Sequence, residues 1–261
     1  MRYPFMLLFS VLVLVLTGCA SAPDKRDPLE PFNRKVYSFN EHADRMVVKP
    51  VAETYTTVIP SPVRTGIHNF LGNLKEVTYF INNMLQGKVE GALISMGRFT
   101  FNSTLGLGGL IDIMTPGGFP VQPEDFGQTL GKWGVGTGPY VMLPLLGPST
   151  VRDASGLLVD TATHINAPAR EPAARYGIVG LNIVDKRVEL LGASNLLDSA
   201  ALDPYVFLRD AYLQKRLAEI YDGNPPVTID PEDPFADENK TEDKPTTSEP
   251  TTSVTPMPVG S

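Results

Sequence analysis

The sequence predicts an all-α domain over residues 27–222, and three observations carry this prediction. Apolar residues recur at steps of three and four over residues 61–86, which is the period of an amphipathic helix. Pro residues directly follow Ser61 and Asp203, a pattern typical of helix starts. Residues 105–148 contain eleven Gly and six Pro, so this stretch is expected to form loops, turns or a short hairpin.

The same signals place the helices in order along the chain. For the longest helix, Ser61 is expected to be the N-cap and Gly87 to end it. The last helix is expected to begin at Asp203-Pro204 and to end near Asp222-Gly223. Weaker periodicity predicts the remaining helices, at about 31–47, 89–104, 150–164 and 173–197.

The apolar stripe of the 61–86 helix is unusually wide, because few polar residues lie between Phe70 and Leu85. A stripe of this kind most often packs into a protein core. It also fits a helix that lies at a lipid surface. The sequence leaves both interpretations open.

The first 18 residues are typical of a bacterial lipoprotein signal peptide. Arg2 supplies a positive charge, and the apolar run over 5–16 is too short to cross about 30 Å of hydrocarbon. Leu16-Thr17-Gly18-Cys19 then resembles a lipobox, so acyl chains are expected on Cys19 after cleavage. The alternative is an ordinary secretory signal that ends near a cysteine. Ala20-Ser21 follows without an Asp, which favours the outer membrane over the inner one.

Composition divides the rest of the chain into a short tether (19–26), one domain (27–222) and a tail (223–261). The net charge of the 261 residues is −7, and most of it belongs to the tail, whose Pro, Thr and acidic residues predict disorder. The domain is nearly neutral, which gives no support to nucleic-acid binding. No apolar run after Cys19 is long enough for a transmembrane helix, and a single cysteine predicts no internal disulfide.

Signals of catalysis are poor throughout the sequence. There is no G-x-S-x-G, H-E-x-x-H or P-loop pattern, so no catalytic residue is expected. The three histidines, His42, His68 and His164, show no ligand-like spacing, and neither a metal site nor a cofactor is expected. The Gly-rich patches 106–109 and 131–138 depart from phosphate-binding patterns and are expected to serve tight turns.

Charged residues inside apolar segments are the remaining candidates for function. Arg98 and Asp112 are two examples, and Arg152-Asp153 is a third. In a soluble domain such residues form ion pairs in or beside the core. In a membrane-inserted domain they face the interior or a water-filled cavity.

Long strings of residues across the domain resemble the MlaA (VacJ) family of outer-membrane lipoproteins. They open with Asp27-Pro-Leu-Glu-Pro-Phe-Asn-Arg34 and continue with Asn69-Phe-Leu-Gly-Asn-Leu74 and Asn83-Met-Leu-Gln-Gly87. The longest is Arg98-Phe-Thr-Phe-Asn-Ser-Thr-Leu-Gly-Leu-Gly-Gly-Leu-Ile-Asp112, and Glu124-Asp-Phe-Gly-Gln-Thr-Leu-Gly131 and Gly138-Pro-Tyr-Val-Met-Leu-Pro144 follow it. Asp203-Pro-Tyr205 and Arg209-Asp-Ala-Tyr-Leu-Gln214 close the match, which leaves the tail outside.

The resemblance implies a ring-like assembly of amphipathic helices around an amphipathic channel, embedded in the periplasm-facing inner leaflet of the outer membrane. It implies association with a trimeric outer-membrane porin and no covalent chemistry. Phospholipids mislocalised to the outer leaflet would be taken up and passed to a soluble periplasmic carrier. A structural lipoprotein that braces porins without transport is the alternative, and a lipid hydrolase is a third interpretation.

The resemblance also suggests where a gate and a channel lining lie. Residues 105–122 resemble the family's hairpin loop beside the channel, so Gly106, Gly108 and Gly109 are expected to tune or gate the opening. Further residues are expected to line the channel from their residue type alone: Arg98, Asp112, Arg152, Lys186 and Arg187.

Overall fold

The computed structural model describes residues 24–165, 172–200 and 202–226, and these residues are mostly helical, as predicted. The predicted signal peptide, the lipid attachment at Cys19 and nearly all of the acidic tail lie outside the described residues. The described residues up to Pro225 belong to one compact unit. Among the described residues, none of the helices is long and apolar enough to cross a membrane.

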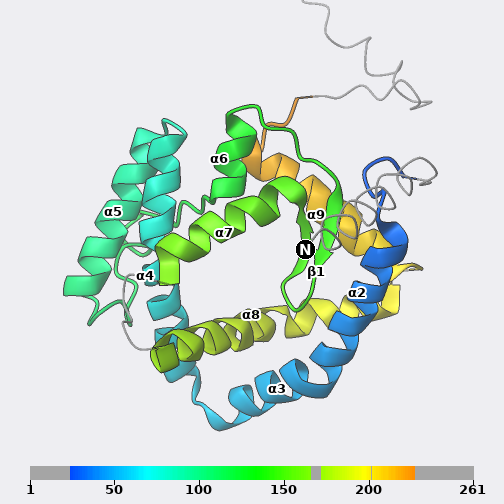
Figure 1. Cartoon of the computed structure of the whole chain (residues 1–261). Helices are drawn as coiled ribbons and strands as arrows, with labels where there is room; N and C mark the ends of the chain where they lie inside the picture. The colour runs from blue at the N-terminus through cyan, green and yellow to red at the C-terminus, as the bar shows by residue number, and fades with distance from the viewer. Residues whose placement is uncertain (1–23, 166–171, 201, 227–261) are drawn as a thin grey trace, which may run out of the picture. The chain divides into compact units, whose positions relative to one another are not determined.

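The first helical segment is longer than the predicted 31–47 helix. It consists of α2 (Glu30–Ala43), a π-helical turn η2 (Asp44–Val48) and α3 (Lys49–Val58). Pro50 would normally end a helix because it has no backbone N–H and its ring clashes with the preceding turn. The wider π turn precedes this residue, and the chain turns there into α3 (Figure 1).

The next two helices form a hairpin at the predicted positions. The helices α4 (Ser61–Leu85) and α5 (Val89–Thr104) lie side by side, and Gly87 between them has a φ of +75°, which ends α4 as predicted. The N-cap prediction was wrong by one residue. Pro60 has an extended backbone and is the N-cap, so Ser61 is already helical and its side chain makes no capping hydrogen bond.

The Gly- and Pro-rich stretch contains two short elements. The strands β1 (Tyr140–Leu143) and β2 (Gly147–Thr150) form an antiparallel hairpin in which Tyr140 pairs with Thr150. The helix α6 (Phe126–Lys132) was not predicted. Asp125 caps it by accepting a hydrogen bond from the backbone N–H of Gln128 at 2.8 Å.

The last three helices match the predicted ranges closely: α7 (Val151–Ile165), α8 (Pro172–Ala200) and α9 (Pro204–Ile220). Asp203 is the N-cap of α9, as predicted, because its carboxylate accepts hydrogen bonds from the backbone N–H groups of Tyr205 and Val206. Pro204 occupies the first turn, where the missing N–H costs no hydrogen bond.

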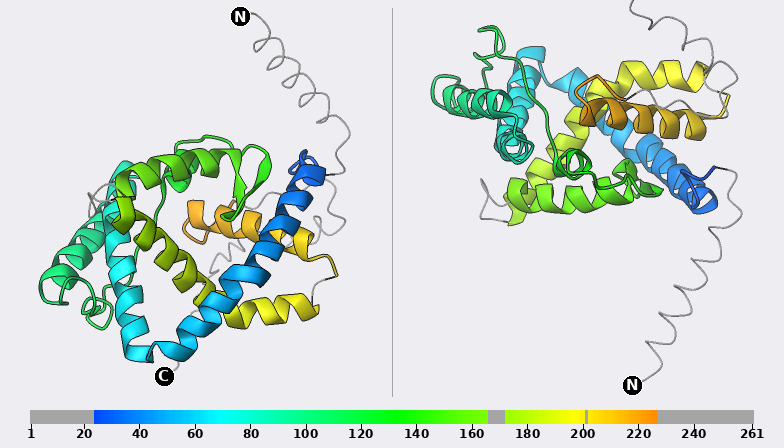
Figure 2. Two further views of the ribbon diagram at one scale, coloured as in Figure 1. Left: turned by 60° about the horizontal axis from the view of Figure 1, so that its bottom comes forward. Right: turned by 90° about the horizontal axis from the view of Figure 1, so that it is seen from above.

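The helices of this unit are arranged in a ring (Figure 1), and the views in Figure 2 show the same arrangement. The helix α4 contacts α7 and α8, α3 contacts α8, and the hairpin contacts α2, α7 and α9. The main apolar cluster is small and consists of Tyr140, Met142 and Tyr205, with partly buried residues such as Tyr37 and Tyr212 around it. Polar contacts therefore hold much of the ring together.

Candidate functional site

The interior of this unit is polar and its surface is rich in apolar side chains, which reverses the pattern of a water-soluble protein. Among the described residues, seven hydrophobic side chains are buried, against twenty polar or charged ones. On α4 the buried residues are polar apart from Leu71, and they include Glu76 and Asn82. Polar groups can be buried only with partners, and exposed apolar surface calls for an apolar cover.

The helix α5 shows both faces of this arrangement. Its buried positions include Arg98 and Asn102, which are 4% and 3% exposed. Val89, Leu93 and Met96 follow one another at steps of four and three on another face, and more than half of each is exposed. The helix thus directs polar groups inward and apolar groups outward.

Arg98 is the centre of a buried polar cluster between α4, α5 and the loop that follows α5. Its guanidinium pairs with Glu76 on α4 through Nε and with Asp112 through Nη2, the latter at 3.1 Å. It also donates hydrogen bonds of 2.8 Å to the hydroxyl of Thr115 and to the carbonyl oxygen of Phe119. These five residues are called the Arg98 cluster below, and they join the loop to the two helices.

Asp112 holds the loop side of the cluster. Its carboxylate accepts hydrogen bonds from the side chain of Asn102 and from the backbone N–H groups of Met114 and Thr115. Burial alone would raise its pKa, but the hydrogen bonds from Thr115 and the charge of Arg98 lower the pKa of Asp112 to about 2. Burial dominates at Glu76, whose pKa is raised despite its pairing with Arg98.

The glycine loop, residues 105–122, turns tightly over the Arg98 cluster. A Cβ atom on Gly106 would lie 2.2 Å from the carbonyl oxygen of Ile111, so only glycine fits there. Gly108 and Gly109 have φ values of +72° and +93°, a region that other residues rarely adopt. A Cβ atom on Gly109 would also lie 2.6 Å from the side-chain nitrogen of Asn73 on α4.

The outer surface of the glycine loop is apolar. The exposed fractions of Leu107, Leu110, Ile111 and Phe119 lie between 46% and 68%. Charged and polar groups of the Arg98 cluster thus anchor the loop on its inner side, and hydrocarbon side chains are exposed on its outer side.

Arg152 belongs to a second buried cluster, on the side of the ring formed by α6, α7 and α9. Its guanidinium pairs with the neighbouring Asp153 at 2.8 Å, and Arg216 on α9 pairs with the same carboxylate at 3.0 Å. Arg216 also pairs with Asp125, the N-cap of α6, at 2.7 Å. These hydrogen bonds and charges lower the pKa of Asp125 and Asp153, against the effect of their burial.

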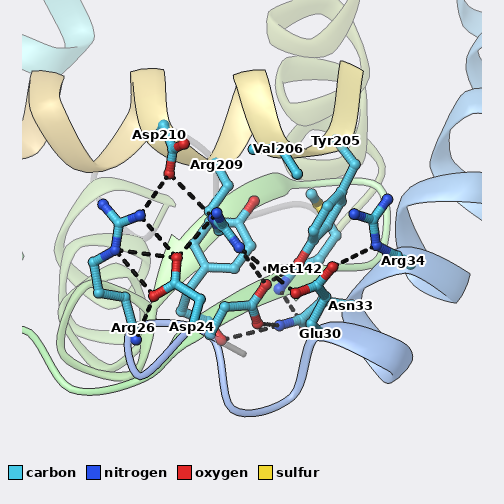
Figure 3. A network of polar contacts seen from close by, with 12 residues as sticks. Asp24, Arg26, Glu30, Asn33, Arg34, Met142, Tyr205, Val206, Arg209 and Asp210 are labelled. Carbon is cyan, nitrogen blue, oxygen red and sulfur yellow. Dashed lines mark hydrogen bonds and ion pairs between the residues drawn. The ribbon is translucent and has the colours of Figure 1, made fainter. Parts of the chain in front are cut away.

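A third cluster ties the beginning of the described chain to α9, and Figure 3 shows part of it. Arg209 is 5% exposed and pairs with Asp24 at 3.0 Å. Asp27 is fully buried and accepts hydrogen bonds from the side chain of Asn33 at 2.8 Å and from the hydroxyl of Tyr205. These contacts fix the start of the domain to α9.

The helix α8 carries the last two sequence candidates. Arg187 pairs with Asp44 of η2 at 2.7 Å, whereas Lys186 is exposed. Of the eight candidates, the structure therefore brings Arg98 and Asp112 together with Gly106, Gly108 and Gly109. Arg152 lies in a separate cluster, and Lys186 and Arg187 lie on α8.

Sequence reasoning missed the partners of these residues. Glu76 and Asn73 lie within the stripe that looked mostly apolar, and their spacing of three was the available signal that they share an inward face. Asp125 and Arg216 are 91 residues apart, so no local pattern joins them.

Comparisons with known proteins agree with this architecture. A family model described as MlaA lipoprotein matches residues 25–219. The intermembrane phospholipid transport system lipoproteins MlaA of Shigella flexneri and of Escherichia coli K12 are each 38% identical over 209 residues, which is 77% of this chain and 82% of theirs. The corresponding lipoprotein of Haemophilus influenzae is 34% identical over 80% of this chain and 88% of its own length.

A solved structure is similar as well. It was reported as the structural basis for maintenance of bacterial outer membrane lipid asymmetry. It superimposes with a TM-score of 0.64 at 36% sequence identity, over 76% of this chain and 99% of the solved one.

Proposed function

Because this chain belongs to the MlaA family of lipoproteins, we propose that it acts in intermembrane phospholipid transport and maintains the lipid asymmetry of the outer membrane. The observation that carries the proposal is the polar interior of a unit whose surface is apolar. A phospholipid headgroup crosses an apolar zone only at a cost of several kcal/mol or more. The apolar outer surface seats the ring among acyl chains, the buried polar clusters hold the ring together, and a path past its exposed polar groups lowers the barrier for the headgroup.

The glycine loop is the proposed gate of this path. Its tight turn at Gly108 and Gly109 and its apolar outer surface suit a lid, and the Arg98 cluster fixes its base. Arg98 and Arg152 are too deeply buried to touch a passing headgroup, so their proposed role is to position the loop and the helices. Lys186 is exposed and is the proposed contact for headgroup phosphate.

The proposal also covers how the chain is held at the membrane and which partners it has. Cys19 is proposed to carry acyl chains that hold the chain in the inner, periplasm-facing leaflet of the outer membrane. A trimeric porin is the proposed membrane partner, and a soluble periplasmic carrier is the proposed acceptor of the lipid. The chain is proposed to move lipid without breaking a covalent bond.

A deletion strain tests the transport proposal against a purely structural role. We expect phospholipid to accumulate in the outer leaflet and the cells to become sensitive to detergent with a chelator. The wild-type gene should restore asymmetry, as should Gly72→Ala, which adds a methyl group with no atom within 4 Å. Gly108→Val, which strains the turn of the loop at a positive φ although its Cβ atom meets nothing within 4 Å, should restore it poorly. Normal asymmetry in the deletion strain would refute transport.

Three further measurements address the lipid anchor, the partners and the absence of covalent chemistry. Cys19→Ser should remove acylation, detected as the loss of the lipid mass from the mature chain. Native mass spectrometry of the detergent-extracted wild type should report a trimeric porin bound to the chain together with phospholipid. Release of lysolipid or fatty acid from labelled phospholipid by the purified chain would contradict the absence of covalent chemistry.

A further inference from the structure

Three potential metal ligands from two helices meet at one point of the ring. His68 Nδ1 on α4 lies 2.9 Å from Asp185 Oδ2 and 3.2 Å from Glu189 Oε1, both on α8. The three ligand atoms all lie within 4.8 Å of one another. We propose that these residues bind a divalent transition-metal ion of the zinc type between α4 and α8.

The fold creates this arrangement from residues that are far apart in the sequence. Asp185 and Glu189 are four residues apart on α8 and therefore share one face of the helix. The helix α4 contacts α8, and His68 brings its imidazole to that face across a sequence separation of 117 residues. The histidine pattern alone predicted no metal site, because two of the three ligands are carboxylates on a distant helix.

The donor set selects the class of ion. Zinc is bound tetrahedrally by imidazole nitrogen and carboxylate oxygen with bonds of about 2.0–2.2 Å, which places neighbouring ligand atoms about 3.3 Å apart. The distances from His68 Nδ1 are already close to this value. Magnesium and calcium prefer oxygen ligands only, so the imidazole disfavours them. Three protein ligands leave the fourth position to water.

Burial and charge also fit a cation here. Asp185 is 8% exposed, whereas the side chains of His68 and Glu189 are 51% and 53% exposed, so an ion can reach the site and the two outer ligands can adjust. Two carboxylates and a neutral imidazole give a charge of −2, which a divalent ion balances. The hydroxyl oxygen of Tyr55 is buried without a hydrogen-bond partner in the described part of the chain; burial raises the pKa of Tyr55, and the nearby charge of Asp185 raises it further.

The charge of Lys75 on α4 acts against a cation at this site. Burial and the charge of Lys186 lower the pKa of Lys75, and Glu189 and Asp185 act on Lys75 in the opposite direction. Lys75 is therefore close enough to repel a bound cation. Removing the charge of Lys75 is expected to tighten metal binding. A variant at Lys75 should therefore change the affinity in the opposite direction to the loss of a ligand.

Calorimetric titration with Zn²⁺ tests the site on the full-length lipoprotein, extracted in detergent, without a histidine tag and stripped with a chelator. We expect one ion per chain. His68→Gln and Glu189→Gln should each weaken binding by about tenfold or more, and Lys75→Gln should strengthen it. His42→Gln is the matched control, because His42 is an exposed histidine of α2 outside this cluster, and it should bind as the wild type does.

Thermal unfolding gives a second reading that does not depend on lipid transport. Zn²⁺ should raise the Tm of the wild type and of His42→Gln, because an ion that binds only the folded state stabilises it. Zn²⁺ should leave the Tm of His68→Gln unchanged. Mg²⁺ should change the Tm of none of the three proteins. Absence of saturable binding at one Zn²⁺ per chain, or unchanged affinity in His68→Gln, would overturn the proposal.

Discussion

Replacing Arg98 by Met removes the guanidinium that joins the glycine loop to α4 and α5. The substitution keeps most of the side-chain volume but leaves the carboxylate of Glu76, which is 1% exposed, without its charge partner. The carbonyl oxygen of Phe119 loses its hydrogen bond as well. Breaking a buried ion pair by removing one partner costs about 3–5 kcal/mol.

Glu76 limits this loss by taking up a proton. Its pKa is already raised by burial, and Arg98 is the main group that lowers it. Without Arg98 the pKa of folded Glu76 rises further above its ordinary value of 4.5. A group with a raised folded pKa contributes stability below its unfolded pKa and loses it as the pH rises through the folded pKa. The variant should therefore be weakest at neutral and higher pH and approach the wild type near about pH 4.

Thermal unfolding followed by circular dichroism in detergent measures the effect. A loss of about 3 kcal/mol in a domain of this size lowers the Tm by roughly 6–12 °C. Lys215→Met is the control, because the Lys215–Glu219 pair is exposed and such pairs are worth at most about 1 kcal/mol. Arg98→Met combined with Glu76→Met should recover part of the loss, since the carboxylate of Glu76 is removed with its partner while Asp112 keeps its hydrogen bonds from Asn102, Met114 and Thr115. The reasoning fails if Arg98→Met has the same Tm as Lys215→Met. It also fails if the double variant is no more stable than Arg98→Met alone.

Five further substitutions at four positions test other parts of the ring by denaturant or acid unfolding. Gly109→Ala should destabilise the fold by about 1–3 kcal/mol through strain at positive φ, whereas Gly72→Ala in α4 should stabilise it by about 0.5–1 kcal/mol. Asp203→Ala should cost about 1 kcal/mol through loss of the α9 cap, and Asp203→Asn should cost less. The pKa of Asp153 is lowered mainly by Arg216. The contribution of Asp153 to the free energy of unfolding is therefore present above about pH 4 and is lost on acidification. Asp153→Asn should make acid unfolding less steep. Equal effects of the paired variants, or an unchanged acid transition, would contradict these assignments.

Local signals in the sequence were sufficient for most helices. The helix α5 begins and ends at the predicted residues, and α9 begins at its predicted cap, because periodicity and capping act over a few neighbouring residues. The continuation through η2 into α3 was missed because a proline normally ends a helix and a π turn leaves no clear sequence pattern. The seven-residue helix α6 was missed among glycines, although its Asp125-x-x-Gln128 cap was visible.

The candidate site depended on long-range contacts that the sequence does not encode locally. Arg98 and Asp112 were identified as unusual charges, but their common partner Thr115 and the anchoring carboxylate of Glu76 emerged only from the fold. The sequence did not decide whether the apolar stripe on α4 packs into a core or faces lipid. In the structure most of its apolar residues are half-buried, and the polar residues Asn73 and Glu76 between them are buried, Glu76 most deeply of all on α4.

The ion pair between Asp24 and Arg209 fixes the start of the domain to α9, so the residues between Cys19 and Asp24 set the length of chain that connects Cys19 to the ring. Cys19 lies five peptide steps before Asp24, and a fully extended chain covers at most about 17 Å over that distance. With acyl chains on Cys19, the corner of the ring at α9 stays within that radius of the leaflet surface, whatever the rest does. If Cys19 carries acyl chains, as proposed, so short a tether would restrict the tilt of the ring and keep the side formed by α9 close to the bilayer.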